Sequence, residues 1–162
     1  MAKKRGTGTP ATVALSAAGI PFELHPYEHD PAAASFGLEA ARALGVEPER
    51  VFKTLLADTD AGIVVGVVPV VGMLDLKALA AAVGAKRATM ADPDVAERRT
   101  GYVVGGISPI GQKTAHPTVV DESAQLFDTV FVSGGKRGLD LELSPADLLS
   151  ATRGVFARIA KD

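Results

Sequence analysis

The stretch Val51-Phe52-Lys53-Thr54-Leu55-Leu56 decides the fold of this chain. Its branched and aromatic residues follow the turn signal Pro48-Glu49-Arg50, a pattern typical of a β-strand. Side chains in a strand alternate between two faces, so Val51, Lys53 and Leu55 share one face, and Phe52, Thr54 and Leu56 share the other. A charged residue therefore stands in the middle of an apolar strand.

Lys53 is the unusual residue of this strand. An unpaired ammonium is unfavourable inside a sheet because burial removes its hydration. Lys53 therefore needs a carboxylate, a water-filled cavity or an anionic ligand, unless it lies on an edge strand and extends its amine into water. The strand alone leaves these alternatives open.

The segments around this strand predict a mixed α/β fold in one domain. Helices are expected at 11–18, 35–45, 76–83, 93–101 and 145–149, each with a capping residue or proline at its start. Strands are expected at 20–25, 63–68, 118–121, 129–133, 139–143 and 155–159, and 63–68 lacks alternation and so should be covered on both faces. Within the second helix, the buried side is expected to hold Leu38, Ala41 and Leu44. Residues 1–8 are expected to form a flexible tail and 9–162 the domain.

Composition narrows the function. The 162 residues include no cysteine, which excludes disulfides, zinc–thiolate sites and a cysteine nucleophile. The net charge of −2 provides no overall basic field for nucleic acid. No long apolar run or signal peptide is visible, so a soluble, cytoplasmic protein without membrane contact is expected. His25 and His29 have the spacing of helical zinc ligands, but Pro26 prevents that helix, so no metal is expected.

Two glycine-rich segments are candidate ligand loops. The first, Gly106-Ile107-Ser108-Pro109-Ile110-Gly111-Gln112-Lys113-Thr114, nearly matches a phosphate-binding loop, but Gln112 stands where the lysine belongs. His116-Pro117 follows where a helix must begin, and nucleotide hydrolysis is therefore excluded. The second is Gly134-Gly135-Lys136-Arg137-Gly138, which is expected to turn the chain. Both segments either form tight turns or bring backbone N–H groups close to a ligand.

No nucleophile motif such as GxSxG or HExxH is present, so an enzyme built on this chain would depend on positioning and electrostatics.

Several short segments together resemble one family. They keep their order and spacing from about residue 9 to the last strand, and they are Thr9-Pro10-Ala11, Tyr27-Glu28-His29-Asp30-Pro31, Phe36-Gly37, Val51-Phe52-Lys53-Thr54-Leu55-Leu56, Leu74-Asp75-Leu76-Lys77, Met90-Ala91-Asp92-Pro93, Thr100-Gly101-Tyr102, Gly105-Gly106-Ile107-Ser108-Pro109, Gly111-Gln112-Lys113 and Ser133-Gly134-Gly135-Lys136-Arg137-Gly138-Leu139-Asp140. In these segments the chain resembles the YbaK/EbsC-type aminoacyl-tRNA deacylases, best known as Cys-tRNA(Pro) deacylases.

The resemblance implies a fold and a site. The fold would be a curved mixed sheet flanked by helices, with one pocket on the sheet and no cofactor. The essential lysine of the family falls on Lys53. Gly105 and Gly106 would offer N–H donors to the reacting carbonyl, and the remaining substrate contacts would come from Tyr27, Phe36, Thr54, Ile107, Ser108, Pro109 and Asp140. Asp140 would either pair with Lys53 or accept a hydrogen bond from the substrate's α-amino group.

The resemblance also implies a role in the cytoplasm. The protein would clear cysteine from tRNA(Pro), and from tRNA(Cys) as a second substrate, with help from the substrate thiol and in complex with prolyl-tRNA synthetase. Phe52 stands where the family often has tyrosine, and Pro26 where other residues occur, which leaves substrate preference open. The alternatives are a deacylase for Ala-tRNA(Pro) or for a broader range of substrates, and a non-catalytic module that binds tRNA or a synthetase.

Overall fold

The computed structural model describes residues 8–33 and 35–162. The elements of these residues, in chain order, are α1 (Pro10–Ala18), β1 (Glu23–Pro26), α2 (Phe36–Leu44), η1 (Pro48–Arg50), β2 (Phe52–Thr59), β3 (Gly62–Pro69), β4 (Met73–Leu74), α3 (Leu76–Ala82), β5 (Ala88–Met90), α4 (Pro93–Thr100), β6 (Thr118–Asp121), η2 (Glu122–Leu126), β7 (Val130–Lys136), β8 (Leu139–Leu143), α5 (Pro145–Thr152), β9 (Val155–Ala157) and β10 (Ala160–Lys161). The predicted mixed α/β fold is confirmed. Residues 1–7 of the expected tail lie outside the described residues.

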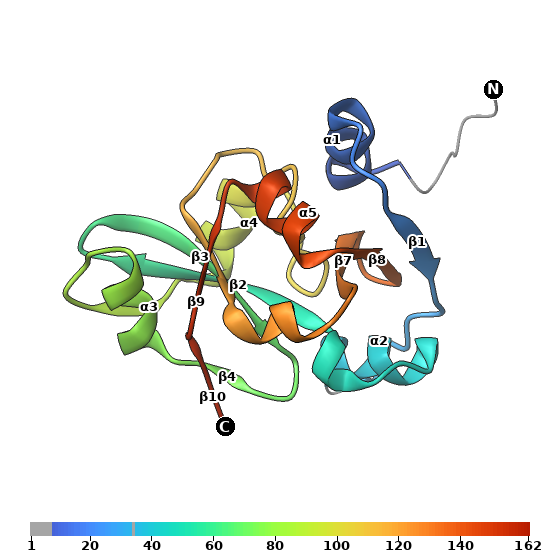
Figure 1. Cartoon of the computed structure of the whole chain (residues 1–162), viewed down its shortest axis with the longest axis horizontal. Coiled ribbons are helices and arrows are strands. Elements are labelled where there is room, and N and C mark those ends of the chain that lie inside the picture. The colour runs from blue at the N-terminus through green and yellow to red at the C-terminus, as the bar shows by residue number, and fades with distance from the viewer. Residues whose placement is uncertain (1–7, 34) are drawn as a thin grey trace.

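The strands form two main sheets and a short pair (Figure 1). The larger sheet has the order β5-β2-β3-β6-β9, with β2 antiparallel to both β3 and β5 and with β3, β6 and β9 parallel. The smaller sheet is antiparallel, in the order β1-β8-β7, and β4 pairs with β10. An isolated parallel bridge between Val51 and Phe131 links the two main sheets. In place of the one curved sheet expected from the sequence, the described residues form two main sheets that are joined at this bridge.

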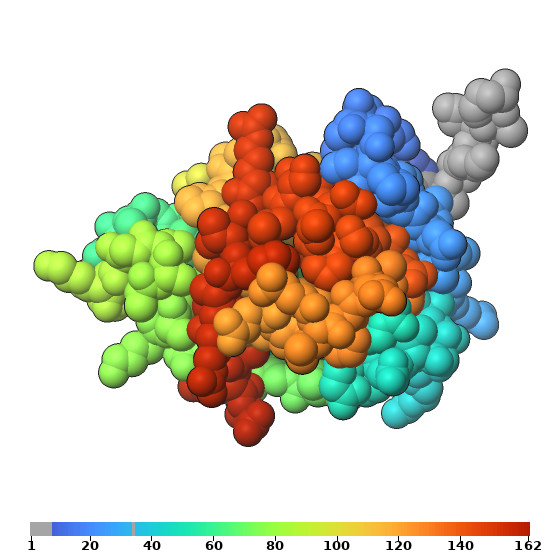
Figure 2. Space-filling model, viewed as in Figure 1, coloured from blue at the N-terminus to red at the C-terminus, as the bar shows by residue number. Residues whose placement is uncertain are grey.

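Strand β3 lies at the centre of the larger sheet, as its unbroken apolar sequence predicts. Val65 and Val67 pack on one side, in a core that also contains α1, α5 and the inner face of the smaller sheet. Val64 and Val68 pack on the other side, in a core with α3 and Ile159. Figure 2 shows that η2, α5 and β9 cover one face of the molecule.

The helix ends follow the predicted caps. Thr9 and Thr12 form a reciprocal capping box at the start of α1, and Gly19 ends this helix in the left-handed conformation. At α2 the Ser35 side chain accepts from the N–H of Leu38, and Gly45 ends the helix in the left-handed conformation. None of the helices in the described residues has the length and apolar character needed to cross a lipid bilayer.

The prediction for the buried side of α2 is partly wrong. Leu38 is 42% exposed, whereas Ala40 and Ala41 are buried. The helix faces the sheet with its small residues, because Gly37 lies directly against Val70 and leaves no room for a larger side chain between them. This close approach places Phe36, at the start of α2, beside the sheet.

The predicted turn at residues 134–138 is also corrected. Strand β7 continues through Gly134 and Gly135 to Lys136, with a bulge between Ser133 and Lys136, so only Arg137 and Gly138 turn the chain. Gly135 has a φ of +110°, and a Cβ there would lie 2.9 Å from Thr9 and 3.0 Å from Tyr102. The glycines therefore serve the bulge and its close packing.

Candidate active site

A cavity of about 390 Å³ lies against β2. Its wall is formed by residues of α2, β2, α4, the loop after α4 and the smaller sheet, namely Tyr27, Ser35, Phe36, Gly37, Ala40, Val51, Phe52, Lys53, Thr54, Leu55, Leu56, Met90, Ala91, Pro93, Ala96, Val104, Gly105, Ile107, Ser133 and Asp140. A volume of this size is at the small end of the range for ligand-binding cavities.

The cavity lies beside the edge of β2 rather than on a face of the sheet. Among the described residues, strand β5 pairs with Ala57–Thr59 of β2, and the N–H of Ala91 donates to the Leu56 carbonyl at 3.0 Å. The edge of β2 before Leu56 has no paired strand beyond the bridge at Val51. All six residues of the stretch 51–56 line the cavity, although their side chains alternate between faces. An open strand edge therefore forms one wall.

Lys53 lies in this wall, half-buried, and no hydrogen bond or ion pair joins its amine to another of the described residues. Burial lowers the pKa of its amine, because the charged form loses hydration. Among the residues described, no carboxylate lies within 4.0 Å of Lys53, so the expected alternative of an ion pair with Asp140 is not formed. The ammonium faces a cavity, which leaves it available to a ligand.

Asp140, on β8, also lines the cavity and is 5% exposed. Burial raises the pKa of its carboxyl to about 7, and no partner among the described residues offsets that burial. Tyr27 lines the same wall, and burial, followed by the neighbouring Asp140 charge, raises the pKa of its hydroxyl to about 12. At neutral pH the site therefore contains a carboxyl close to its titration point next to a neutral tyrosine.

Thr54 adds a buried hydroxyl to this wall. Its Oγ1 is fully buried and has no hydrogen-bond partner among the described residues. Buried polar groups normally have partners, since leaving one unpaired costs about 1–3 kcal/mol. Thr54 lines the cavity, but its Oγ1 has almost no accessible surface, so a bound molecule reaches this hydroxyl only when the atoms that cover it shift.

The loop after α4 contributes fewer residues than expected. Gly105 and Ile107 line the cavity, together with Val104. The N–H of Gly106 donates to the Val103 carbonyl at 2.8 Å, so this group is used within the turn and is not free for a reacting carbonyl. The structure gives no acceptor for the N–H groups of Gly105 and Ile107 among the described residues, and both residues line the cavity.

Ser108 and Pro109 are buried behind the loop and do not reach the cavity surface. Ser108 Oγ accepts from the N–H of Ile110 at 3.2 Å, and its carbonyl accepts from Gln112 at 2.9 Å. Its observed contacts thus stabilise the loop. The predicted site residues that the structure brings together are Lys53, Thr54, Tyr27, Phe36, Gly105, Ile107 and Asp140.

Arg137 forms part of the rim and was not among the expected site residues. Its guanidinium lies 5.0 Å from the centre of the Phe36 ring and donates to the Val104 carbonyl at 2.9 and 2.6 Å. A Cβ on Gly105 would lie 2.8 Å from Arg137 Nε and 2.9 Å from the Phe36 ring. The glycine thus allows the arginine to connect α2 to the loop. The position of Arg137 in the second glycine-rich segment was the sequence feature that could have identified it as a site residue.

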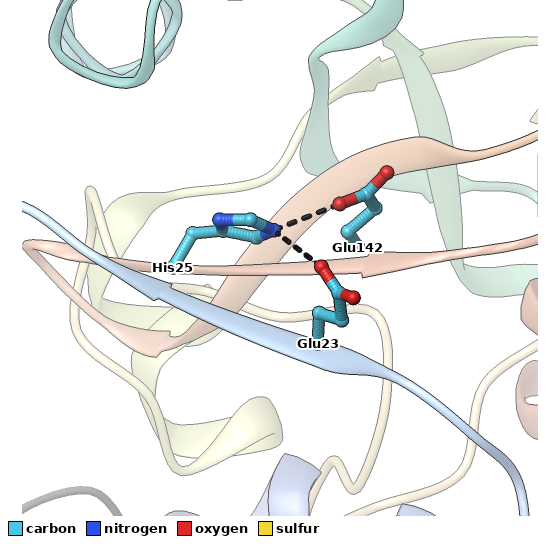
Figure 3. Close-up of side chains that lie close together, drawn as sticks. All are labelled: Glu23, His25 and Glu142. Atoms are coloured by element: carbon cyan, nitrogen blue, oxygen red, sulfur yellow. Dashed lines mark hydrogen bonds and ion pairs between the residues drawn. The ribbon is translucent and has the colours of Figure 1, made fainter.

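A second cluster of polar side chains lies on the face of the smaller sheet that carries Asp140. Figure 3 shows His25 between two carboxylates, with its Nε2 at 2.8 Å from Glu142 and 3.5 Å from Glu23. The other oxygen of Glu142 accepts from Thr129 at 2.5 Å and from Arg50 at 3.4 Å. Glu23, His25 and Glu142 offer three atoms within metal-binding distance of one another, but Arg50 already supplies a cation to Glu142.

His29 does not join this group. Its Nδ1 lies 2.9 Å from Glu39 of α2, and its ring lies beside Phe36. The two histidines that have helical zinc spacing in the sequence therefore have separate partners, as the intervening proline predicts.

The arrangement suits an activated ester with an amino group. Lys53, Thr54, Asp140 and the loop residues Gly105 and Ile107, whose N–H groups have no acceptor among the described residues, line one small cavity. The N–H groups and the cation can stabilise an oxyanion, and the carboxylate can bind an ammonium.

Comparisons with known proteins agree with this chemistry. The family model described as "Aminoacyl-tRNA editing domain" matches residues 30–151. The protein named "Putative Cys-tRNA(Pro)/Cys-tRNA(Cys) deacylase EbsC" from Enterococcus faecalis (strain ATCC 700802 / V583) is 47% identical over 120 residues, which cover 74% of this chain and 73% of that protein.

Solved structures share the fold over nearly the whole chain. The "crystal structure of a putative trans-editing enzyme for prolyl tRNA synthetase" is 25% identical, with a TM-score of 0.85, and covers 99% of this chain and 100% of that chain. The crystal structure of a hypothetical protein, 27% identical, has a TM-score of 0.84 and covers 94% of this chain and 99% of that one.

Proposed function

The chain belongs to the aminoacyl-tRNA editing domain family, and from that premise we propose that it is a trans-acting deacylase that removes cysteine from tRNA(Pro). The single observation that carries the proposal is the half-buried ammonium of Lys53 facing a small cavity without a partner among the described residues. The name of the 47% identical relative supports cysteine as the amino acid, and tRNA(Cys) as a second substrate.

The proposed binding mode follows from the charges of the site. The α-ammonium of the cysteinyl group pairs with Asp140, whose carboxylate form is favoured once a cation lies beside it. The ester carbonyl faces Lys53 and the N–H groups of Gly105 and Ile107, and the Thr54 hydroxyl pairs with a polar atom of the substrate. Each contact offsets a group that burial leaves unsatisfied in the free protein.

The proposed reaction needs no protein nucleophile. The thiol of the cysteinyl group attacks its own ester carbonyl, so that an S–C bond forms and the bond from carbonyl carbon to ribose oxygen breaks. The thiol proton passes to the ribose oxygen, which releases tRNA and a cyclic thiolactone. The protein stabilises the intermediate oxyanion, and removing one such donor typically lowers the rate by about 10²–10³-fold.

Deacylation of a panel of charged tRNAs by wild type and Lys53→Ala tests the proposal. We expect wild type to cleave Cys-tRNA(Pro), and the Lys53→Ala change to lower the rate by at least about 100-fold. Lys77→Ala is the matched control, because Lys77 is an exposed lysine on α3, outside the cavity. Equal rates for wild type and Lys53→Ala would contradict the proposal.

The same panel tests the attacking group. Ser-tRNA(Pro) and Ala-tRNA(Pro) have similar acyl groups without a thiol, so both should be cleaved far more slowly than Cys-tRNA(Pro). Equal cleavage of all three would instead indicate attack by water. Faster cleavage of Ala-tRNA(Pro) would identify an alanine-specific deacylase.

We also propose that the protein acts in complex with prolyl-tRNA synthetase. Support comes from the structural relative described as a trans-editing enzyme for that synthetase, and from the net charge of −2, which disfavours tight binding to free tRNA. Adding the synthetase should increase kcat/KM on Cys-tRNA(Pro) and leave that on Cys-tRNA(Cys) unchanged. An equal effect on both substrates would argue against the complex.

A further inference from the structure

The charges of this chain are unevenly distributed along its sequence. Three segments, 1–22, 98–120 and 129–139, contain no aspartate or glutamate. Together they hold eight of the 17 lysines and arginines, while the rest of the chain holds nine of them and all 19 acidic residues. Three of the eight, Lys3, Lys4 and Arg5, lie outside the described residues. Although the net charge of the protein is only −2, the three segments are basic and the rest of the sequence is acidic.

The structure brings the three acid-free segments together. Thr9 Oγ1 donates to the Gly134 carbonyl at 2.6 Å, which joins the first segment to the third. A Cβ on Gly111 would lie 2.5 Å from the Pro10 carbonyl oxygen, and one on Gly106 would lie 2.7 Å from Lys136 Cα. Glycine permits these approaches because it has no side chain to collide. Segments that are far apart in sequence therefore lie against one another.

Five exposed cations belong to the described part of these segments, and we call them the basic surface: Arg98, Arg99, Lys113, Lys136 and Arg137. The loop that holds Lys113 is fixed to the end of α4, since Lys113 N–H donates to the Thr100 carbonyl at 2.8 Å and Thr114 N–H to the Arg99 carbonyl at 3.0 Å. Arg98, Arg99 and Lys113 therefore form one group at the end of this helix.

The basic surface borders the cavity. Helix α4 lines the cavity with Pro93 and Ala96, and Arg99 follows Ala96 by three residues, which is about 4.5 Å along the helix axis. At the other end, Arg137 stacks on Phe36 at the rim. The loop between these two groups contributes Val104, Gly105 and Ile107 to the cavity wall.

We propose that the basic surface binds the phosphates of the RNA strand whose 3′ end occupies the cavity. The inference rests on the proposed function, because an amino acid esterified to the 3′ end requires the preceding phosphates to cross the cavity rim. In the described residues, the acid-free segments hold five exposed cations and no carboxylate of their own, although Glu97 directly precedes Arg98. The rest of the chain, with its 19 acidic residues, repels a polyanion and so favours one direction of approach.

Neutralising the helix end provides the test. The triple variant Arg98→Gln/Arg99→Gln/Lys113→Gln removes three charges and leaves the cavity wall intact. The matched control is Lys77→Gln/Lys86→Gln/Arg87→Gln, three exposed cations on and after α3. Lys86 and Arg87 lie next to Asp60 at the far end of β2, about 20 Å along the strand from Lys53.

Steady-state deacylation should be measured over a range of salt concentrations with two substrates, Cys-tRNA(Pro) and cysteinyl-adenosine, which carries the ester without phosphates. For the triple variant we expect KM for Cys-tRNA(Pro) to rise about tenfold at low salt, with kcat unchanged. The slope of log KM against log salt should fall by about 2. Cleavage of cysteinyl-adenosine should not change, and the control triple should behave as wild type with both substrates.

Three outcomes would overturn the inference. The first is an unchanged KM for Cys-tRNA(Pro). The second is an equal loss in both triple variants, which would indicate a general charge effect. The third is a change that appears only when prolyl-tRNA synthetase is present, which would assign the surface to a protein partner.

Failure of the proposed function is distinguishable from these outcomes. If wild type cleaves neither substrate, the deacylase proposal fails, yet the binding of uncharged tRNA still compares wild type with the triple variant. Weaker and less salt-dependent binding by the triple variant would support the basic surface in that case. Equal binding would overturn it.

Discussion

Asp140 and Glu142 lie two residues apart on β8, on the same face of the smaller sheet, yet their surroundings are opposite. Glu142 binds Thr129, His25 and Arg50, and the hydrogen bond from Thr129, followed by those other partners, holds the pKa of its carboxyl below the usual value. Asp140 has no such partner among residues 8–33 and 35–162, and burial raises the pKa of its carboxyl to about 7. One strand thus carries a paired and an unpaired acid.

The difference between the two acids shows which polar groups of the protein have no partner in the fold and can therefore bind a ligand. Register places His25 directly opposite Asp140, but the imidazole turns to Glu142 instead. The unpaired groups, namely Lys53, Thr54 Oγ1 and Asp140, all line the cavity, whereas the paired group at Glu142 does not. Perturbed and unpaired polar groups that converge on one cavity are typical of a functional site.

The largest expected effect is on stability as a function of pH. Because the pKa of Asp140 is raised in the folded state, the folded protein binds more protons than the unfolded chain between about pH 4 and pH 7. Stability from this group is therefore present at low pH and is lost as pH rises through about 7, by up to about 4 kcal/mol. Urea unfolding of wild type and Asp140→Asn from pH 5 to pH 8 measures this, and the variant should gain on wild type as pH rises. Parallel stability curves would show that Asp140 is not the unpaired acid described above.

The next effect is on catalysis by the same variant. Asp140→Asn keeps the shape of the cavity but removes the charge that pairs with the substrate ammonium. We expect kcat/KM for Cys-tRNA(Pro) to fall by about 100-fold, which corresponds to the loss of one charge-assisted hydrogen bond in a buried site. Glu142→Gln, with the same chemical change two residues away, should alter kcat/KM by less than about threefold. Similar losses in both variants would remove the distinction between the two acids.

Glu142→Gln should instead affect the fold. The glutamine keeps an acceptor but loses the charge that Arg50 and His25 meet, so the free energy of unfolding at pH 7 should fall by about 1–2 kcal/mol. Thermal or urea unfolding with wild type as reference measures this. An unchanged stability would mean that the ion pairs of Figure 3 contribute nothing measurable.

The smallest effect concerns Thr54. Thr54→Val replaces an unpaired buried hydroxyl by a methyl group, so the free protein should become more stable by about 1 kcal/mol. The same change should raise KM for Cys-tRNA(Pro) several-fold, because the substrate loses a hydrogen bond. Thr54→Ser is the control, since it keeps the hydroxyl and should retain the wild-type KM. A Val variant that is destabilised with unchanged KM would show that Thr54 serves packing alone.

Local sequence signals were sufficient for much of the fold and for the centre of the site. The caps at Thr9 and Ser35 depend on residues close in sequence, and so does the central strand β3. Lys53 was identifiable because a cation in an apolar strand requires an explanation wherever the strand lies.

The remaining features depend on contacts between distant segments. The exposure of Leu38 follows from the contact of Gly37 with Val70, and the use of the Gly106 N–H follows from a turn whose geometry no spacing rule defines. Arg137 reaches the rim only because Gly105 and Phe36 lie beside it in space. The bulge in β7 likewise reflects the packing of Gly135 against Thr9 and Tyr102.

The open edge of β2 limits which mutations can change the substrate that the cavity accepts. Main-chain atoms are the same for every amino acid, so mutation changes the backbone part of this wall little, whereas the side chains of Lys53 and Thr54 in the same wall differ with the residue. Changes in the accepted substrate then arise through side chains around the cavity, such as Thr54, Phe36 and Met90. Such a site can exchange one small acyl group for another while the geometry at the reacting bond is inherited unchanged.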